Sequence, residues 1–265
     1  MSPESNHWKV CGLFEAAIAL NQVCHGEKAV KRTLESGVTI ISEFKDFLVV
    51  YKPSGLLSQA GRDPQRPNLE TILKQEFPDY SIRLLSRLDR ETSGLLVVST
   101  GQQENELLDS WHKQNQKFYL ASVEGEFEDS RVELKDYLKE KLGVVKSVRS
   151  GGKPSLCQVV LIEFDRVKNR SLLLVKLQTG RRHQIRVQLG SRGYPVEGDY
   201  KYGAQRECKF FGLQSHALVL SLCEKLDLPT NPLIKANLEG SWGYKSEGLG
   251  EIIGKSLQFL ANVEA

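Results

Sequence analysis

Short apolar, β-branched runs recur along the chain, and many follow one another with only a polar turn between them. The clearest pair is QVVLIEFD at 158–165 and SLLLVKLQ at 171–178, joined by a polar turn at 168–170. Two more runs, VTIIS at 38–42 and DFLVVYK at 46–52, also lie close together. Strands joined by tight turns pair antiparallel, whereas a doubly wound fold needs a helix between successive strands. We therefore expect an α+β fold with a largely antiparallel mixed sheet flanked by helices.

Helical periodicity marks only a few segments. At the N-terminus, Trp8, Cys11, Phe14 and Ile18 recur at helical spacing and predict a helix over 8–36. Further helices are expected from Asn68, which can cap one, and over about 102–115, 179–193 and 249–263. We also expect a strand, a turn and a second strand within 81–100, a strand at 117–125 and a loop at 147–155.

Composition restricts the function only weakly. The chain has 36 basic and 33 acidic residues, a formal net charge of +3 that by itself indicates no polyanionic partner. The five cysteines are odd in number and are not spaced as metal ligands, so we expect neither a disulfide framework nor a zinc site. Glu15 interrupts the apolar N-terminal stretch, which no basic region precedes, and no apolar run is long enough to span a bilayer. We therefore expect a cytoplasmic protein without membrane contact.

The first segment with unusual chemistry is the polar turn within 81–100. It carries Asp89 between Arg87 and Arg90, and the hydroxyls and permissive backbone of Thr92–Gly94 suit a tight turn. Adjacent arginines favour the ionised form of a carboxylate, and an ionised, partly desolvated aspartate is a usable nucleophile. Taken alone, such a turn is more often a solvated surface turn whose charges pair with one another.

The second segment is TGRRHQIRVQLGSRG at 179–193, which predicts an amphipathic helix. Thr179 is the expected cap and Gly193 the expected stop. Ile185 and Leu189 lie four residues apart and can face the core.

The polar face of that helix is expected to carry Arg182 and Arg186, with His183 beside them. Such a face suits contact with a phosphate or a carboxylate. An ordinary surface helix would show the same pattern, and no second His, Cys or carboxylate is spaced to join His183 in a metal site.

Together the two segments resemble the RluA-type pseudouridine synthases. RLDRETSGLLVVST is followed by KFYLASVEG and then by LQTGRRHQIRVQLGSRGYPVEGDYKYG, while VVYKPSGLLSQ, GKPSLCQVVLIEF and GLQSHALVL resemble other parts of that family. The resemblance runs from about 40 to about 229, and several separate motifs in the right order are far more specific than one short pattern. It implies the pseudouridine synthase fold, with a central active-site cleft.

The resemblance also implies an activity: isomerisation of uridine to pseudouridine in ribosomal or transfer RNA. In that family the Asp of the RLD motif is the catalytic carboxylate, which is Asp89 here. The family's pattern places Tyr119 against the target base, pairs Arg186 with the catalytic Asp and puts Arg87 beside the flipped nucleotide. The reaction rearranges atoms without exchanging electrons, so we expect no cofactor and no metal.

Reaction at the base requires that the uridine leave its stack, and phosphate contacts can offset that cost. A single basic residue is more often a solvated surface charge, but here the basic residues cluster around the motifs. The candidate substrate and RNA contacts are Arg87, Arg90, Thr92, Lys117, Arg181, Arg182 and His183, with Lys52, Arg83, Lys201 and Arg206 as further phosphate candidates.

The sequence departs from the family pattern at three places. Ser86 stands where a His is frequent before RLD, Arg182 stands where Thr is common, and Ser215 precedes His216 where Ala is usual. Because none of these positions removes the carboxylate, we still expect activity.

The 265 residues suffice for one catalytic domain with appendages. We expect an N-terminal helical extension over 1–37, a catalytic domain over 38–230 and a C-terminal extension over 231–265 packed on that domain. The expected partner is RNA, with no obligatory protein partner, and the expected state is a monomer.

Two rival interpretations have different consequences. A catalytically inactive RNA-binding relative would keep the basic surface but need not keep Asp89, Tyr119 and Arg186 together. A glycosidase using Asp89 and Glu91 needs carboxyls on opposite sides of a sugar, for which one tight turn is a poor frame. Asp89 itself could attack the base, attack the sugar or stabilise a charged or glycal-like intermediate, and the sequence leaves these open.

Overall fold

A computed structural model describes residues 31–61, 63, 65–101, 105–221, 233–237, 242–244 and 248–262. Within them, twelve strands form one mixed sheet in the order β1-β2-β3-β5-β11-β6-β10-β9-β7-β8, with β4 paired to β5 and β12 to β11. The β5–β11 pair is parallel and the other pairs are antiparallel. The expected α+β fold with a largely antiparallel sheet is confirmed.

The strands are β1 (Arg32–Thr33), β2 (Thr39–Glu43), β3 (Phe47–Lys52), β4 (Arg83–Leu84), β5 (Ser93–Ser99), β6 (Gln116–Glu124), β7 (Arg131–Lys141), β8 (Val144–Val148), β9 (Lys153–Asp165), β10 (Arg170–Leu177), β11 (Leu213–Val219) and β12 (Leu233–Lys235). The helices are α1 (Leu69–Glu76), α2 (Asn105–Gln114), α3 (Gln184–Gly190) and α4 (Leu249–Asn262), with a short 3-10 helix, η2, at Tyr200–Tyr202.

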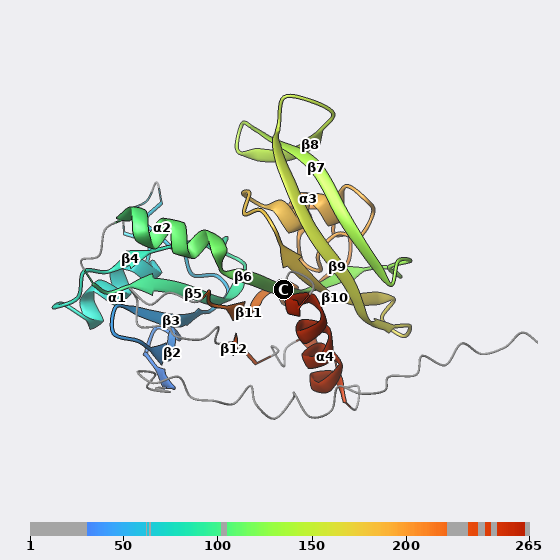
Figure 1. Cartoon of the computed structure of the whole chain (residues 1–265). Coiled ribbons are helices and arrows are strands. Elements are labelled where there is room, and N and C mark those ends of the chain that lie inside the picture. The colour runs from blue at the N-terminus through green and yellow to red at the C-terminus, as the bar shows by residue number, and fades with distance from the viewer. Residues whose placement is uncertain are drawn as a thin grey trace, which may run out of the picture.

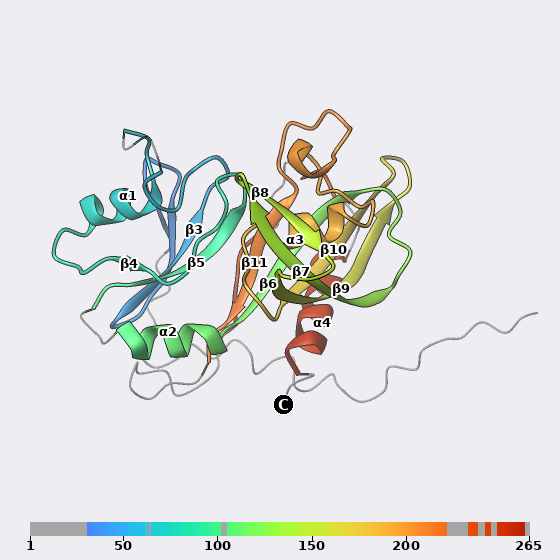
Figure 2. The same cartoon turned by 90° about the horizontal axis from the view of Figure 1, so that it is seen from above.

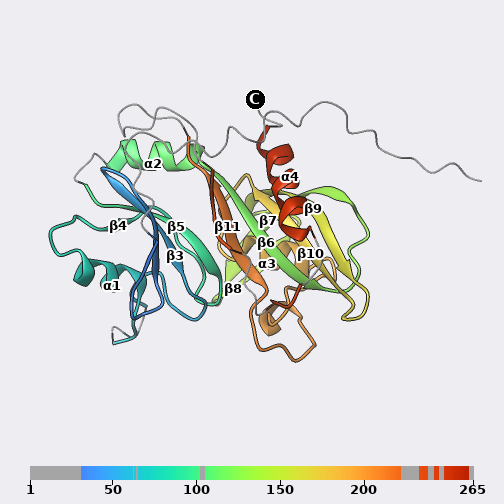
Figure 3. The same cartoon turned by 90° about the horizontal axis from the view of Figure 1, so that it is seen from below.

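The sheet has two halves that meet at its middle. Figure 1 shows β2 to β5 with α1 and α2 on one side, and β7 to β10 with α3 and α4 on the other. Strands β11 and β6 run side by side between them, as the views from above and below confirm (Figures 2 and 3). The Asp89 turn lies in the first half and the segment that carries Arg186 lies in the second, so the junction decides whether they meet.

In the first half, helices cover both faces of β5, which explains why every residue of that strand is buried. Leu96 and Val98 pack with the α1 residues Leu69 and Leu73 on one face. The alternate residues of β5 pack toward α2 on the other face. Helix α1 begins as expected, because the Asn68 side chain accepts a hydrogen bond from the Thr71 backbone N–H at 3.0 Å.

In the second half, α3 and α4 lie on opposite faces of the sheet (Figures 2 and 3). Ile185 and Leu189 of α3 are buried with residues of β6, β9 and β10, as their spacing predicts. Helix α4, expected over 249–263, buries Leu257 and Leu260 against the other face. No helix among the described residues has the length and apolarity needed to cross a bilayer.

The structure corrects the predicted N-terminal helix where it can be compared. Residues 1–30 lie outside the described residues, but within 31–36 the chain forms β1 and a turn rather than a helix. Thr33 pairs with Thr39, and Gly37 closes the turn with a φ of 80°. The pairing of β1 with β2 therefore overrides local helical periodicity.

The structure also shortens the helix predicted at 179–193. Helix α3 begins only at Gln184, because His183 is its N-cap in a left-handed conformation without a side-chain capping bond. Thr179 does not cap the helix; its hydroxyl contacts the Gln184 side chain at 2.8 Å and the Leu156 N–H at 2.8 Å. Similarly, the loop predicted at 147–155 is narrower, since β8 ends at Val148 and β9 begins at Lys153.

Candidate active site

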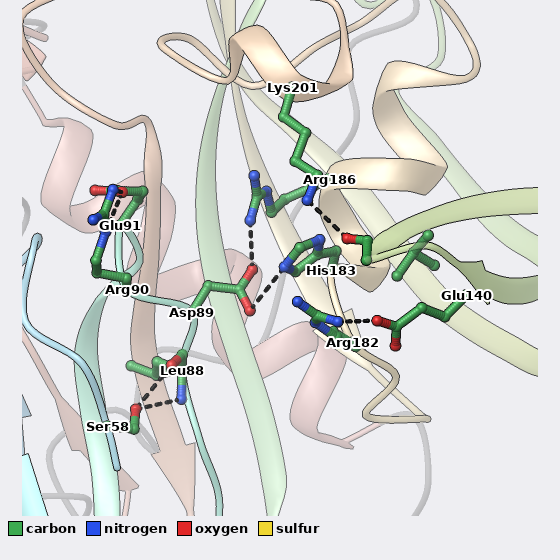
Figure 4. A network of polar contacts seen from close by, with 12 residues as sticks. Ser58, Leu88, Asp89, Arg90, Glu91, Glu140, Arg182, His183, Arg186 and Lys201 are labelled. Carbon is green, nitrogen blue, oxygen red and sulfur yellow. Dashed lines mark hydrogen bonds and ion pairs between the residues drawn. The ribbon is translucent and has the colours of Figure 1, made fainter. Parts of the chain in front are cut away.

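Asp89 lies in the turn between β4 and β5, and the loop after β3 braces that turn. The buried Ser58 hydroxyl donates to the Leu88 carbonyl at 2.8 Å and accepts from the Leu88 N–H at 3.1 Å. The Thr92 N–H donates to the Asp89 carbonyl at 3.1 Å. These bonds brace the backbone on both sides of Asp89, and Figure 4 shows its carboxylate pointing away from Ser58 toward Arg186 and His183.

Gly94 lets the Asp89 turn approach the other half of the sheet. It pairs with Ser215 where β5 runs parallel to β11, at a φ of 115°. A Cβ at this position would collide with the Ser215 backbone. The glycine of the motif is therefore required by a close backbone contact.

Arg186 reaches across the junction to Asp89. Its Nη1 donates to Asp89 Oδ2 at 2.8 Å, although the two residues are 97 positions apart in the chain. Figure 4 shows Arg186 and His183 pointing at the Asp89 carboxylate from the opposite side of the site. Arg186 is buried and the Asp89 side chain keeps 24% of its surface exposed, so the pair lies at the edge of the solvent.

Asp199 holds the far side of the same guanidinium. Its two carboxylate oxygens accept from Arg186 Nε at 2.7 Å and Nη2 at 2.8 Å, a bidentate pair. Burial alone would lower the pKa of Arg186, but the hydrogen bonds and charge of Asp199, followed by those of Asp89, raise it. Sequence reasoning missed Asp199, although it lies within the GDYKYG stretch of the resemblance; only its contact with Arg186 reveals a role.

His183 stands beside Asp89, in surroundings that disfavour its protonated form. Its Nε2 is 3.6 Å from Asp89 Oδ1, and its Nδ1 is 2.6 Å from the Tyr202 hydroxyl. Burial is the main cause that lowers the His183 pKa to about 4; Asp89 opposes this shift, while Arg186, Arg182 and Lys201 add to it. The ring is therefore neutral at pH 7.

Tyr119 of β6 lies on the same pocket. Burial raises the pKa of Tyr119 to about 12, a hydrogen bond with Ser215 opposes the shift, and the charge of Asp89 adds to it. The hydroxyl is therefore protonated at neutral pH. The ring packs against the apolar clusters of both halves of the sheet, at their junction.

A pocket open to solvent brings these groups together. It is lined by Arg87, Leu88, Asp89, Thr92, Tyr119, Leu177, Arg181, His183, Gln184, Ile185, Arg186 and Leu213. The lining combines one carboxylate, several basic groups and apolar walls. This arrangement suits a planar, uncharged ring attached to an anionic backbone.

The family model described as RNA pseudouridylate synthase matches residues 46–191, a span that contains Asp89, Tyr119 and Arg186. The chain belongs to the RNA pseudouridylate synthase family. The dual-specificity RNA pseudouridine synthase RluA of Vibrio parahaemolyticus is 35% identical over 196 residues, which cover 69% of this chain and 76% of that protein. The membership in the RluA branch that the motifs imply is confirmed.

Other relatives in this family extend well beyond the matched residues. The ribosomal large subunit pseudouridine synthase C of Vibrio vulnificus is 32% identical over 170 residues, which cover 63% of this chain and 53% of that protein. The chain thus spans about half the length of the first curated relatives that it matches.

Two solved human structures confirm the pseudouridine synthase fold. RNA pseudouridylate synthase domain containing 4 superposes with a TM-score of 0.60 at 19% identity, covering 75% of this chain and 88% of that chain. RNA pseudouridylate synthase domain containing 1 gives a TM-score of 0.58 at 23% identity, covering 81% of this chain and 96% of that chain. At these identities the likeness concerns the fold.

The remaining predicted contacts lie outside the pocket of this family member. Arg90 is exposed and pairs with Glu91, because its Nε donates to Glu91 Oε1 at 2.6 Å. Arg182 precedes α3, where it pairs with Glu140 instead of sharing a helical face with Arg186 (Figure 4). Lys117 lies two residues before Tyr119 on β6, and burial lowers its pKa to about 8.

The predicted phosphate contact of Lys52 is not supported by its position. It is fully buried, and its Nζ donates to the carbonyls of Pro53, Leu56 and Arg90. It therefore shapes the loop that braces the Asp89 turn rather than offering its charge to a phosphate. Within the part of the chain that the structure describes, no cluster of three His, Cys, Asp or Glu side chains could hold a metal ion.

Proposed function

We propose that the chain is an RNA pseudouridine synthase, which isomerises uridine in ribosomal or transfer RNA with Asp89 as the catalytic carboxylate. The observation that carries this proposal is the Asp89–Arg186 ion pair of 2.8 Å beside Tyr119, in a pocket open to solvent. Membership in the family supports the same reaction.

The reaction breaks the bond between ring N1 and sugar C1′ and forms a bond between C5 and C1′. The hydrogen on C5 leaves as a proton and N1 takes up a proton, so atoms and electrons balance without a co-reactant. The catalyst must therefore stabilise a separated sugar and base and move one proton. One well-placed carboxylate can do so by attacking either fragment or by stabilising their charges.

Arg186 aims the carboxylate. Its guanidinium is fixed on one side by two bonds to Asp199 and takes Oδ2 of Asp89 on the other. The second oxygen, Oδ1, accepts no hydrogen bond from the described residues and faces His183 at 3.6 Å. Holding one oxygen while leaving the other available pre-orients Asp89 for reaction.

Tyr119 supplies a surface for the extruded base. Stacking of a base on an aromatic ring is worth about 1–3 kcal/mol, which helps to offset the cost of flipping. Because its hydroxyl is protonated at neutral pH, Tyr119 acts there as a donor rather than as a phenolate.

Basic residues around the pocket support RNA binding. Arg87 and Arg181 are exposed and line the pocket, and buried Thr92 adds a hydroxyl. We assign these three to the flipped nucleotide. Arg90, Lys117 and Arg182 lie outside the pocket lining and would contact the RNA farther along its backbone.

Tritium release tests the proposal. RNA labelled with tritium at C5 of uridine must lose the label to water when pseudouridine forms. Asp89→Asn should abolish tritium release and largely spare RNA binding. The control Glu91→Gln, which removes the neighbouring carboxylate of the same turn, should still release tritium. Wild-type protein that binds RNA without release would be an inactive relative, and free uracil as product would indicate a glycosidase; either result refutes the proposal.

A further inference from the structure

The hydroxyl of Tyr202 lies between His183 and the β7–β8 hairpin. It accepts the Val145 backbone N–H at 3.3 Å and lies 2.6 Å from His183 Nδ1. Burial is the main cause that raises the Tyr202 pKa, so the hydroxyl carries its proton at neutral pH. The proton can point at His183, because Nδ1 is within hydrogen-bond distance of the Tyr202 oxygen.

The direction of the second bond follows the protonation of the imidazole, and the surroundings of the Tyr202 hydroxyl favour a bare Nδ1. If Nδ1 carried a proton, the Tyr202 oxygen would accept twice and its own proton would have no acceptor among the described residues. If Nδ1 is bare, the Tyr202 hydroxyl donates to it and each group is satisfied. The ring proton then resides on Nε2, which is the nitrogen 3.6 Å from Asp89 Oδ1.

The charges around the ring support a neutral imidazole. Arg182 lies before α3, Arg186 lies on it, and Lys201 lies on η2; all three oppose protonation of His183, and only Asp89, from the β4–β5 turn, favours it. A neutral N–H beside Asp89 adds no second positive charge to the one that Arg186 provides. An imidazolium there would pair with the carboxylate and reduce its basicity.

We propose that Tyr202 is a positioning residue that holds His183 as the neutral tautomer with its proton on Nε2, so that this N–H faces the free oxygen of Asp89. The role rests on the proposed function, since it concerns the same carboxylate.

The β7–β8 hairpin sets the position of Tyr202. Val145 of that hairpin packs with Leu138 and with Val187 of α3, and the Tyr202 ring lies against this cluster. The same ring faces the Arg186 guanidinium at 5.0 Å. The packing of the hairpin on α3 and η2 therefore positions Tyr202, which contacts His183, which in turn lies beside Asp89.

The first test reads the tautomer directly, by nitrogen-15 NMR of histidine-labelled protein without RNA. At pH 7 the His183 signals, assigned from their loss in His183→Asn, should show a bare Nδ1 and a protonated Nε2. In Tyr202→Phe, which keeps the ring and removes only the hydroxyl, His183 should become protonated at a higher pH. A wild-type His183 that is doubly protonated, or protonated on Nδ1, at pH 7 would overturn the inference, even if Tyr202→Phe fails to fold.

The second test uses tritium release. Tyr202→Phe should lower kcat by about three- to tenfold, the worth of one hydrogen bond, with an unchanged KM for RNA and an acid limb displaced to higher pH. His183→Gln, whose amide N–H can reach the Nε2 position, should keep more activity than the shorter His183→Asn and should make the Tyr202→Phe change nearly silent. If Tyr202→Phe lowers kcat equally in the wild-type protein and in His183→Gln, Tyr202 does not act through His183 and the inference is refuted. Absence of release by wild-type protein would instead refute the proposed function, while the spectrum would still decide the tautomer.

Discussion

Replacing Asp199 with alanine should destabilise the protein strongly, because the buried guanidinium of Arg186 then keeps only one of its two carboxylate partners. Arg186 and Asp199 are both buried, and two bonds of 2.7 and 2.8 Å join them. Each hydrogen bond to a charged group contributes about 1.5–3 kcal/mol, and breaking a buried ion pair from one side costs about 3–5 kcal/mol. The remaining bond to Asp89 cannot satisfy the freed Nε and Nη2, so we expect the free energy of unfolding to fall by about 3–5 kcal/mol.

Urea denaturation at pH 7, followed by circular dichroism, measures this loss as a shift of the midpoint at constant slope. Asp109→Ala is the matched control. Asp109 pairs with Arg83 at 2.7 Å, but the two side chains are 49% and 36% exposed. An exposed pair of this kind contributes about 0–1 kcal/mol. If Asp199→Ala costs no more than Asp109→Ala, the bidentate pair is not the anchor of Arg186 and the reasoning fails.

Three further predictions concern packing, pH and salt. Gly94→Ala should prevent a stable fold, because the new methyl group would collide with the Ser215 backbone; a soluble variant with an unchanged melting temperature would contradict this. The free energy of unfolding should fall as the pH drops below about 6.5, because burial lowers the pKa of His112 to about 3 and of His216 to about 4. The unfolded state then binds more protons, and each histidine should cost on the order of 1–2 kcal/mol by pH 5; denaturation curves that coincide at pH 7 and pH 5 would refute it. RNA affinity should fall steeply with salt, and Arg181→Ala should reduce the slope of log affinity against log salt by about one; a flat wild-type dependence would remove the phosphate contacts proposed here.

The strands were largely predictable because their signal is local. Consecutive apolar runs with polar turns encode β2–β3 and β9–β10, and a side chain that bonds its own helix start encodes the cap at Asn68. The wrong predictions fall where contacts with distant residues override the local sequence pattern. At 179–183 the Gln184 side chain bonds the Arg181 N–H and the Leu156 carbonyl, so β9 holds this stretch as a turn and delays the helix.

The chemistry divides in the same way. Motifs in the sequence identify the available groups: a carboxylate in a tight turn, an arginine-rich helix and an aromatic strand, which together form a family pattern. Which of these groups meet depends on how the strands pair, since Asp89 and Arg186 come together where β5 pairs with β11. Asp199 and Tyr202 become candidates solely through their contacts with Arg186 and His183. Hydrogen bonds and ion pairs act over a few ångströms in space, whatever the separation of the residues along the chain, so a local pattern does not encode them.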